Sequence, residues 1–275
     1  MSTSPPPLSP DVVVAMLRAA GCVFAEDEAR LLASAARSAA ELATMVDRRV
    51  TGVPLEHVLG WAEFCGLRIA VAPGVFVPRR RTGFLVREAV GLLRAGSTGR
   101  EGRVPARPVV VDLCCGSGAL GAALAAEVGD VELHAADVEP VAVECARGNV
   151  AAAGGRVYEG DLYDPLPAGL RGRVDVLVAN VPYVPSEEVT LLPAEARLHE
   201  PLVALDGGAD GLDVLRRVAA AAPLWLAPGG HLLVETSERQ APSALDVLTH
   251  SGLAARLTGC DELGATVVVG TRRWS

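Results

Sequence analysis

The segment Asn180-Val181-Pro182-Tyr183 carries the side chains best suited to chemistry in this chain. It directly follows residues 174–179, an apolar run with the composition of a buried strand. The side-chain oxygen of Asn180 and the main-chain carbonyl of Val181 can each accept one hydrogen bond from an NH2 group. Pro182 stiffens the turn, and Tyr183 offers a flat face to a planar group. These residues therefore predict a site that holds an amide or amine nitrogen and stabilises the positive charge that develops as the nitrogen forms a bond.

A second segment, DLCCGSGALG at residues 112–121, joins an apolar strand to a helix. Gly116 and Gly118 allow the backbone to turn tightly and a ligand to approach it closely. The letters GSGALG also fit the GxGxxG fingerprint of dinucleotide-binding turns. Asp112, however, is expected inside this turn, where its carboxylate would face the phosphates of a dinucleotide. The turn therefore favours a ligand that carries positive charge and no phosphate.

Two further acids follow the next two strands. Asp137 ends the second strand, where a carboxylate can accept both hydroxyls of a ribose. Asp161 follows the third strand and can accept from an adenine amino group, with Leu162 packing on the ring. An acid in the glycine turn and an acid after the second strand suit S-adenosylmethionine, because it has a sulfonium and no phosphate. Together with the segment that begins at Asn180, they predict methyl transfer to nitrogen by in-line attack in a dry pocket, without a metal.

The elements that must position these residues alternate between strand and helix from residue 109 onward. Predicted strands cover residues 109–114, 131–137, 156–160, 174–179 and 230–236, and predicted helices cover residues 119–128, 140–153, 211–222 and 241–250. Residues 253–259 and 265–273 predict an antiparallel pair at the end of the chain. This alternation is typical of an α/β fold with a doubly wound, mostly parallel sheet.

The chain before this sheet has a different pattern. Residues 10–50 are rich in Ala and Leu at helical spacing, and residues 61–74 resemble a short hairpin or an extended connector. We therefore expect two domains. Residues 1–72 form a helical N-terminal domain with its connector hairpin, and residues 73–275 form the domain that carries the chemistry.

Composition excludes several classes of protein. The chain of 275 residues has a net charge of -8, which argues against direct binding to nucleic acid. No apolar run approaches the roughly 20 residues of a membrane span, and the first residues do not form a secretory signal. We expect a cytoplasmic monomer without a membrane partner. No CxxC pair or Cys/His cluster predicts a metal site. Arg79, Arg80, Arg81 and Arg87 are expected to form a solvated basic face.

Taken together, the motifs resemble those of the HemK-type release-factor glutamine methyltransferases. The resemblance covers nearly the whole chain and rests on residues 60–80 and on DLCCGSGALG, AADVEP, EGDLYDPLP and NVPYVP in that order. HEPLVALDGGADGLDVLRRV, residues 199–218, is an especially specific match. The resemblance implies a Rossmann-like class I methyltransferase sheet with an antiparallel C-terminal strand. It also implies a small helical domain that helps to dock the release factor.

The same resemblance implies the reaction and the residues that serve it. Proteins of this kind methylate the N5 amide nitrogen of the glutamine in the GGQ motif of peptide chain release factors. By likeness, Asn180, Val181, Pro182 and Tyr183 hold that amide. The S-adenosylmethionine site would be lined by Cys114, Cys115, Gly116, Ser117, Gly118, Asp137, Asp161, Leu162 and Asn180.

The sequence departs from the pattern of the family at three places. Val181 replaces the first proline of NPPY but keeps the main-chain carbonyl, Cys114 replaces a glycine, and residues 78–82 read PRRRT instead of PRPET. Other hypotheses stay open beside the leading one. The acceptor can be the N6 atom of adenine in a nucleic acid, or a small molecule. The glycine turn can belong to an NAD-dependent oxidoreductase, or the chain can be a degenerate methyltransferase that only binds.

Overall fold

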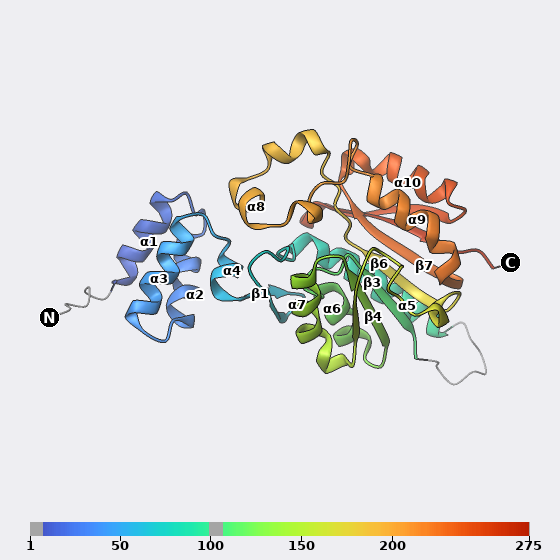
Figure 1. The fold of residues 1–275 in the computed structure, drawn as a ribbon, viewed down its shortest axis with the longest axis horizontal. Coiled ribbons are helices and arrows are strands. Elements are labelled where there is room, and N and C mark those ends of the chain that lie inside the picture. Colours follow the sequence, from blue (N-terminus) through green and yellow to red (C-terminus); the bar gives the residue numbers. More distant parts are fainter. Residues whose placement is uncertain (1–7, 99–106, 275) are drawn as a thin grey trace.

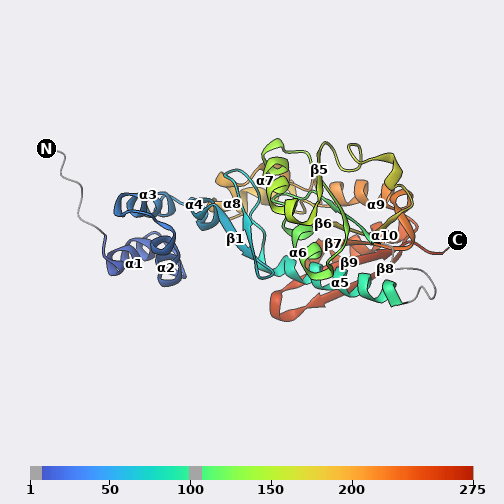
Figure 2. The same cartoon turned by 90° about the horizontal axis from the view of Figure 1, so that it is seen from below.

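The structure is a computed structural model that describes residues 8–98 and 107–274 (Figure 1). Helices α1 (Pro10–Ala19), α2 (Ala25–Ala35) and α3 (Ala39–Val50) form a small bundle at the N-terminal end. Each helix contributes a fully buried apolar side chain to one core, namely Leu17, Leu32 and Val46. This core is separate from the cores around the large sheet, and Figure 2 shows the bundle set to one side of the molecule. The expected N-terminal helices are confirmed.

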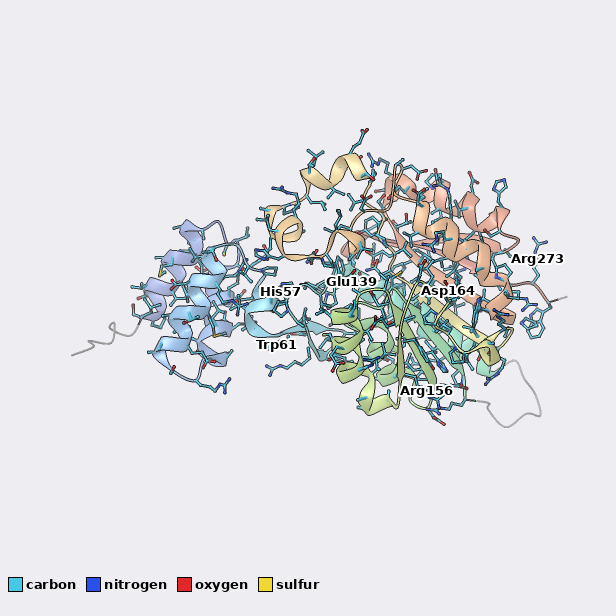
Figure 3. All side chains as sticks on the ribbon, viewed as in Figure 1. His57, Trp61, Glu139, Arg156, Asp164 and Arg273 are labelled. Carbon is cyan, nitrogen blue, oxygen red and sulfur yellow. The ribbon has the colours of Figure 1, made fainter. Side chains whose placement is uncertain are left out.

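A short helix and a hairpin connect the bundle to the rest of the chain. Helix α4 (Leu55–Leu59) leads into β1 (Trp61–Phe64) and β2 (Leu67–Ala70), which pair antiparallel as predicted. Cys65 and Gly66 form the turn with φ of 50° and 75°, the pair of positive values that a tight two-residue hairpin turn needs. His57 is buried at this junction, beside Trp61 in Figure 3, and its Nε2 donates to the Val75 carbonyl over 2.8 Å.

The large sheet has seven strands in the order β5-β4-β3-β6-β7-β9-β8. The strands are β3 (Val109–Leu113), β4 (Glu132–Asp137), β5 (Arg156–Glu159), β6 (Val174–Ala179), β7 (Leu226–Thr236), β8 (Ala254–Cys260) and β9 (Ala265–Thr271). The first five in this order are parallel, and β9 runs antiparallel between β7 and β8. The expected α/β fold with a reversed strand near the C-terminus is therefore confirmed. The carboxyl ends of β3, β4 and β6 meet at one edge of the sheet.

Helices cover both faces of this sheet, which explains why every residue of β3 is buried. The helices are α5 (Gly83–Thr98), α6 (Ala119–Val128), α7 (Pro140–Val150), α9 (Asp213–Trp225) and α10 (Ala241–His250). Apolar side chains of α5 and α6 share one core, and those of α9 and α10 share the core on the opposite face. Between β6 and α9 the chain forms an arm, residues 186–204, which contains α8 (Ala194–His199) between two 3-10 turns.

Several element boundaries differ from the sequence-based expectation, and those of β7 and α9 show why. Strand β7 begins at Leu226 rather than residue 230, because its register against β6 shifts from Val174↔Leu226 to Val176↔His231. The strand therefore includes Ala227, Pro228, Gly229 and Gly230, although their composition is typical of a loop. Helix α9 continues through Pro223 to Trp225. In the described part of the chain, no helix is both long and apolar enough to cross a bilayer.

Candidate functional site

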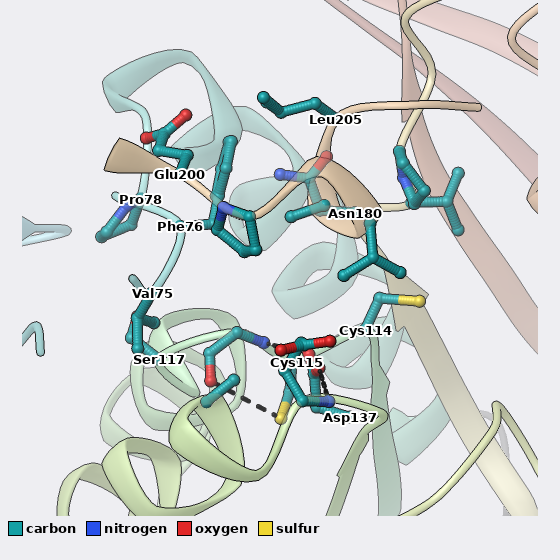
Figure 4. Close-up of a pocket in the computed structure, with 18 of the residues that line it drawn as sticks. Val75, Phe76, Pro78, Cys114, Cys115, Ser117, Asp137, Asn180, Glu200 and Leu205 are labelled. Carbon is teal, nitrogen blue, oxygen red and sulfur yellow. Dashed lines mark hydrogen bonds between the residues drawn. The ribbon is translucent and has the colours of Figure 1, made fainter. Parts of the chain in front are cut away.

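The carboxyl ends of β3, β4 and β6 open into a cavity of about 580 Å³ (Figure 4). The arm and the segment that follows the hairpin complete its walls. The cavity brings together most of the residues that the sequence singled out: Cys114, Cys115, Gly116, Ser117, Asp137, Asp161, Leu162, Asn180, Val181, Pro182 and Tyr183. Asp112 and Gly118 are the two expected residues that do not line it.

The turn between β3 and α6 uses left-handed backbone three times. Cys114, Gly116 and Gly118 have φ of 54°, 54° and 74°. For a residue with a side chain this conformation costs about 1–2 kcal/mol, so Cys114 occupies a position that favours glycine. Gly118 is the N-cap residue of α6 and faces α7, where an added Cβ would lie 3.0 Å from the Cβ of Ala146. Gly118 is therefore required for the packing of two helices against each other rather than for the cavity wall.

Asp112 lies on β3 rather than in the turn, which corrects the expectation from the sequence. It is fully buried, its Oδ2 accepts from the Gly121 N–H over 2.9 Å, and its Oδ1 has no partner. Burial raises the pKa of this carboxyl to about 7, against the smaller lowering effect of the Gly121 N–H. The carboxyl therefore caps the first turn of α6. A dinucleotide would place its pyrophosphate at that helix terminus, so this cap argues against one.

Asp137 ends β4 and lines the cavity beside the glycine turn (Figure 4). Its Oδ2 accepts from the Gly116 N–H over 2.8 Å, and its Oδ1 accepts from the Glu139 N–H over 3.0 Å. Burial raises the pKa of the carboxyl, while these N–H groups oppose the rise. The two bonds fix the orientation of the carboxylate, and each oxygen retains a lone pair for a further donor.

Asp161 and Leu162 form the cavity wall that follows β5. Leu162 has a φ of 48°, so the backbone turns sharply at this point. Arg217 of α9 forms an ion pair with Asp161 and also lines the cavity. The sequence did not indicate Arg217, because 56 positions separate it from its partner.

Asn180 directly follows β6, and Figure 4 shows its side chain on the cavity side, between Phe76 and Leu205. Its Oδ1 is buried and has no hydrogen-bond partner. Within residues 8–98 and 107–274, no donor pairs with the Val181 carbonyl either. Two acceptor oxygens on adjacent residues are thus left unused beside the cavity. Buried acceptors are normally paired, so both oxygens are available to a donor from a bound molecule.

Tyr183 is held by two residues that lie far from it in the sequence. The Arg81 Nη2 hydrogen-bonds the Tyr183 hydroxyl, and the Arg81 Nε donates to Glu235 Oε1 over 3.0 Å. Burial raises the pKa of the Tyr183 phenol, with the Glu235 charge as a second cause, so the phenol is neutral at pH 7. Gln240 fixes the backbone from the other side by donating to the Tyr183 carbonyl over 2.9 Å.

Two of the four arginines that were expected to form a solvated basic face are partly exposed but also form ion pairs with buried acids. Arg81 pairs with the buried Glu235, and the Arg79 Nη2 donates to both oxygens of Glu200 over 2.6 and 2.7 Å. Arg80 remains exposed. The two ion pairs cannot be recognised in the sequence, because 154 and 121 positions separate the arginines from their acids.

Comparisons with known proteins identify relatives of the chain and of its fold. Residues 103–208 match the family described as "Methyltransferase small domain". The chain is 37% identical to the release factor glutamine methyltransferase of Geobacter sulfurreducens over 230 residues, which cover 83% of this chain and 76% of the relative. It is 38% identical over 202 residues to the 4-amino-L-phenylalanine/4-methylamino-L-phenylalanine methyltransferase of Streptomyces pristinaespiralis, covering 72% and 66% of the two chains. Among solved structures, the ribosomal protein L11 methylase of Lactobacillus delbrueckii subsp. bulgaricus has a TM-score of 0.51 at 16% identity, covering 75% of this chain and 86% of that one. This structural likeness concerns the fold.

Proposed function

Because the chain belongs to the family of release factor glutamine methyltransferases, we propose that it methylates the side-chain amide nitrogen of a glutamine in a peptide chain release factor. S-adenosylmethionine is the methyl donor and supplies, when bound, a methyl carbon that the adjacent sulfonium makes electrophilic. The observation that carries the proposal is the buried Oδ1 of Asn180, which has no partner and belongs to a residue of the cavity wall.

The donor set of the cavity suits S-adenosylmethionine. Asp137 presents a fixed carboxylate with free lone pairs, which suits the two ribose hydroxyls. The backbone of residues 114–117 allows close approach, and Asp161 with Leu162 would receive the adenine ring. The first turn of α6 is already capped by Asp112, so the site lacks the feature that binds a phosphate.

Asn180 and Val181 would prepare the acceptor for reaction. The lone pair of an amide nitrogen is delocalised, which makes the nitrogen a poor nucleophile. One N–H donated to Asn180 Oδ1 and the other to the Val181 carbonyl would hold the NH2 group in one orientation and aim the nitrogen. The same two oxygens would stabilise the positive charge that develops on the nitrogen, and the proton would leave after transfer.

Pro182 and Tyr183 would complete the acceptor site. Pro182 is buried and restricts the turn that presents the Val181 carbonyl. The Tyr183 ring is held through its hydroxyl by Arg81, so it offers a fixed face to the planar amide. No ionised base is needed in this scheme, which agrees with the neutral state of the Tyr183 phenol.

The helical part, within residues 1–72, would dock the acceptor protein, and residues 73–275 would perform the chemistry. Two contacts support this division of roles. Pro54 and Glu56, at the end of the bundle, line the cavity together with residues of the arm. Arg49 of α3 approaches Glu195 of α8 to 3.5 Å, so the bundle and the arm meet beside the same cavity (Figure 1). A loop of a docked protein would enter at this place.

The proposal is tested with isotopically labelled S-adenosylmethionine. The enzyme is incubated with the release factors of its host, either intact or with the GGQ glutamine replaced. Label on the intact factors alone would support the proposal, and Asn180→Ala should slow this labelling by about a hundredfold to a thousandfold. Cofactor binding without label on any release factor would overturn the choice of acceptor while leaving methyl transfer in place.

A second candidate is methylation of the aromatic amine of a free amino acid. It is favoured by the 38% identity to the Streptomyces pristinaespiralis enzyme. An aromatic amine, like an amide, presents two N–H groups to the oxygens of Asn180 and Val181. The same assay with 4-amino-L-phenylalanine distinguishes the two candidates, because label on the amino acid and none on the release factors would favour the second.

A further inference from the structure

Arg81 carries hydrogen-bond donors that the protein does not use. A guanidinium has five N–H donors in one plane. The Arg81 Nε donates to Glu235 Oε1, and its Nη2 is bonded to the Tyr183 hydroxyl. Its Nη1 has no partner among residues 8–98 and 107–274, and Arg81 lines the cavity. At least two N–H groups are therefore free next to the residues proposed to hold the acceptor.

Buried neighbours hold this guanidinium in place. The Glu235 side chain is 3% exposed, whereas the Arg81 side chain is 45% exposed. The Nε and Nη2 atoms are thus held by Glu235 and Tyr183, while almost half of the Arg81 side chain stays exposed. Nearby, Thr82 and Glu235 each have a buried oxygen without a partner, so the polar groups around Arg81 are incompletely satisfied. A fixed donor edge that is only partly satisfied is suited to receive an oxygen atom of a ligand.

The charges around the cavity indicate which kind of oxygen this is. Six acidic side chains line it: Glu56, Asp137, Glu139, Asp161, Glu195 and Glu200. Three arginines oppose them, Arg79, Arg81 and Arg217, and the charge of Arg81 is already balanced by Glu235. A free carboxylate would enter a cavity with an excess of negative charge and would be repelled. A neutral carbonyl oxygen would gain the charge-assisted bond without this penalty.

We propose that Arg81 Nη1 binds a main-chain carbonyl oxygen of the acceptor, next to the amide that Asn180 and Val181 receive. This inference rests on the proposed function, because it takes the acceptor nitrogen to belong to a polypeptide. Arg81 is then a specificity-determining residue. It selects an amide inside a polypeptide, whose neighbouring carbonyl is neutral, over a free amino acid, whose carboxylate the acidic cavity repels.

Steady-state kinetics with the release factor as substrate test the inference. Arg81→Lys keeps a positive charge for Glu235 and removes the planar fork, so the buried acid is not left without a partner. We expect KM for the release factor to rise about tenfold or more, with kcat changed less than about threefold. The affinity for S-adenosylhomocysteine and the melting temperature should stay unchanged. Arg80→Lys, at the exposed neighbour outside the cavity wall, is the matched control and should behave as the wild type.

An unchanged KM in Arg81→Lys would overturn the inference. So would a rise in KM accompanied by an equal loss of affinity for S-adenosylhomocysteine, because a purely structural role would weaken both sites. Either result leaves the proposed function intact, provided that the wild type methylates the release factor.

A binding experiment decides the case in which the wild type does not methylate the release factor, so that the proposed function itself fails. N-acetyl-L-glutamine methylamide and N-acetyl-L-glutamine are titrated into the enzyme with S-adenosylhomocysteine and followed by NMR. Tighter binding of the neutral methylamide, weakened about tenfold or more by Arg81→Lys and unaffected by Arg80→Lys, would support the role of Arg81. Equal binding of both compounds, preference for the carboxylate, or no binding of the methylamide would overturn it.

Discussion

Replacing Asn180 with alanine should change stability and activity in opposite directions. The Asn180 Oδ1 is buried without a partner, and such a group lowers the free energy of unfolding by about 1–3 kcal/mol relative to a satisfied one. Alanine removes the unsatisfied oxygen. The side chain lines an open cavity, so its truncation enlarges existing space instead of creating a new void. We therefore expect the free energy of unfolding of Asn180→Ala to rise, by up to about 2 kcal/mol, or to stay unchanged.

The same oxygen is proposed to stabilise charge on the acceptor nitrogen as the new bond forms. Loss of one such preorganised group costs about 2.7–4 kcal/mol of transition-state stabilisation, or about a hundredfold to a thousandfold in kcat. Because the Val181 carbonyl remains in Asn180→Ala, some orientation of the amide should survive. Residual activity at the lower end of this range would therefore agree with the scheme.

Urea unfolding and single-turnover methylation of the release factor measure the two effects. Asn149→Ala is a matched control, because the Asn149 amide is fully engaged. It accepts from the Ala70 N–H over 2.9 Å and donates to the carbonyls of Ala70 and Ser117 over 2.9 and 2.8 Å. Asn149→Ala should lose about 1–3 kcal/mol of stability. A comparable loss in Asn180→Ala would refute our account of the unpaired oxygen, and unchanged kcat would refute its role toward the acceptor.

The remaining predictions concern the turn between β3 and α6. Burial raises the pKa of Asp112 from 3.8 to about 7, so the folded state keeps a proton that the unfolded chain releases in this range. The free energy of unfolding should therefore fall as pH rises from about 4 to about 7, and Asp112→Asn should remove this slope in urea titrations. Gly118→Ala should lower the free energy of unfolding by more than about 2 kcal/mol, because φ is 74° and the new Cβ would lie 3.0 Å from the Cβ of Ala146. Gly116→Ala, with φ of 54° and no atom within 4 Å of the new Cβ, should lower it by about 1–2 kcal/mol, and equal urea midpoints for the two variants would contradict this reasoning.

Much of the sheet could be predicted from sequence because its strands are unbroken apolar runs between turn residues. The predicted bounds of β6 (Val174–Ala179) and of α6 (Ala119–Val128) agree with the structure end to end. The start of β7 was missed because Pro228 and Gly229 are typical of a loop, and only the pairing of Leu226 with Val174 of β6 shows that the strand begins before them. The secondary structure of the arm, residues 186–204, could not be predicted, because 3-10 turns and a short helix are too short to show a hydrophobic periodicity.

Part of the candidate site could be predicted from the rule that the carboxyl ends of parallel strands meet at one edge of the sheet. That rule places Asp137 near the segment that begins at Asn180, and the structure agrees. The placement of Asp112 in the turn was wrong although residues 109–114 were predicted as a strand, because Asp112 pairs with Ala135 and Val178 within the sheet. The rule also could not pair Arg81 with Glu235, since that contact depends on how α5 and its preceding turn pack against the end of β7.

The separate core of the N-terminal bundle has an evolutionary consequence. Leu17, Leu32 and Val46 pack among themselves and share no buried contact cluster with the sheet. Surface substitutions on α1 to α3 can therefore accumulate without disturbing the strands that hold the cavity. Under the docking role proposed for the bundle, a lineage could retarget such an enzyme by remodelling or exchanging the bundle while the methyl-transfer machinery stays the same. A chimera that carries the bundle of a relative should accordingly retain cofactor binding and take its choice of acceptor protein from the donor of the bundle.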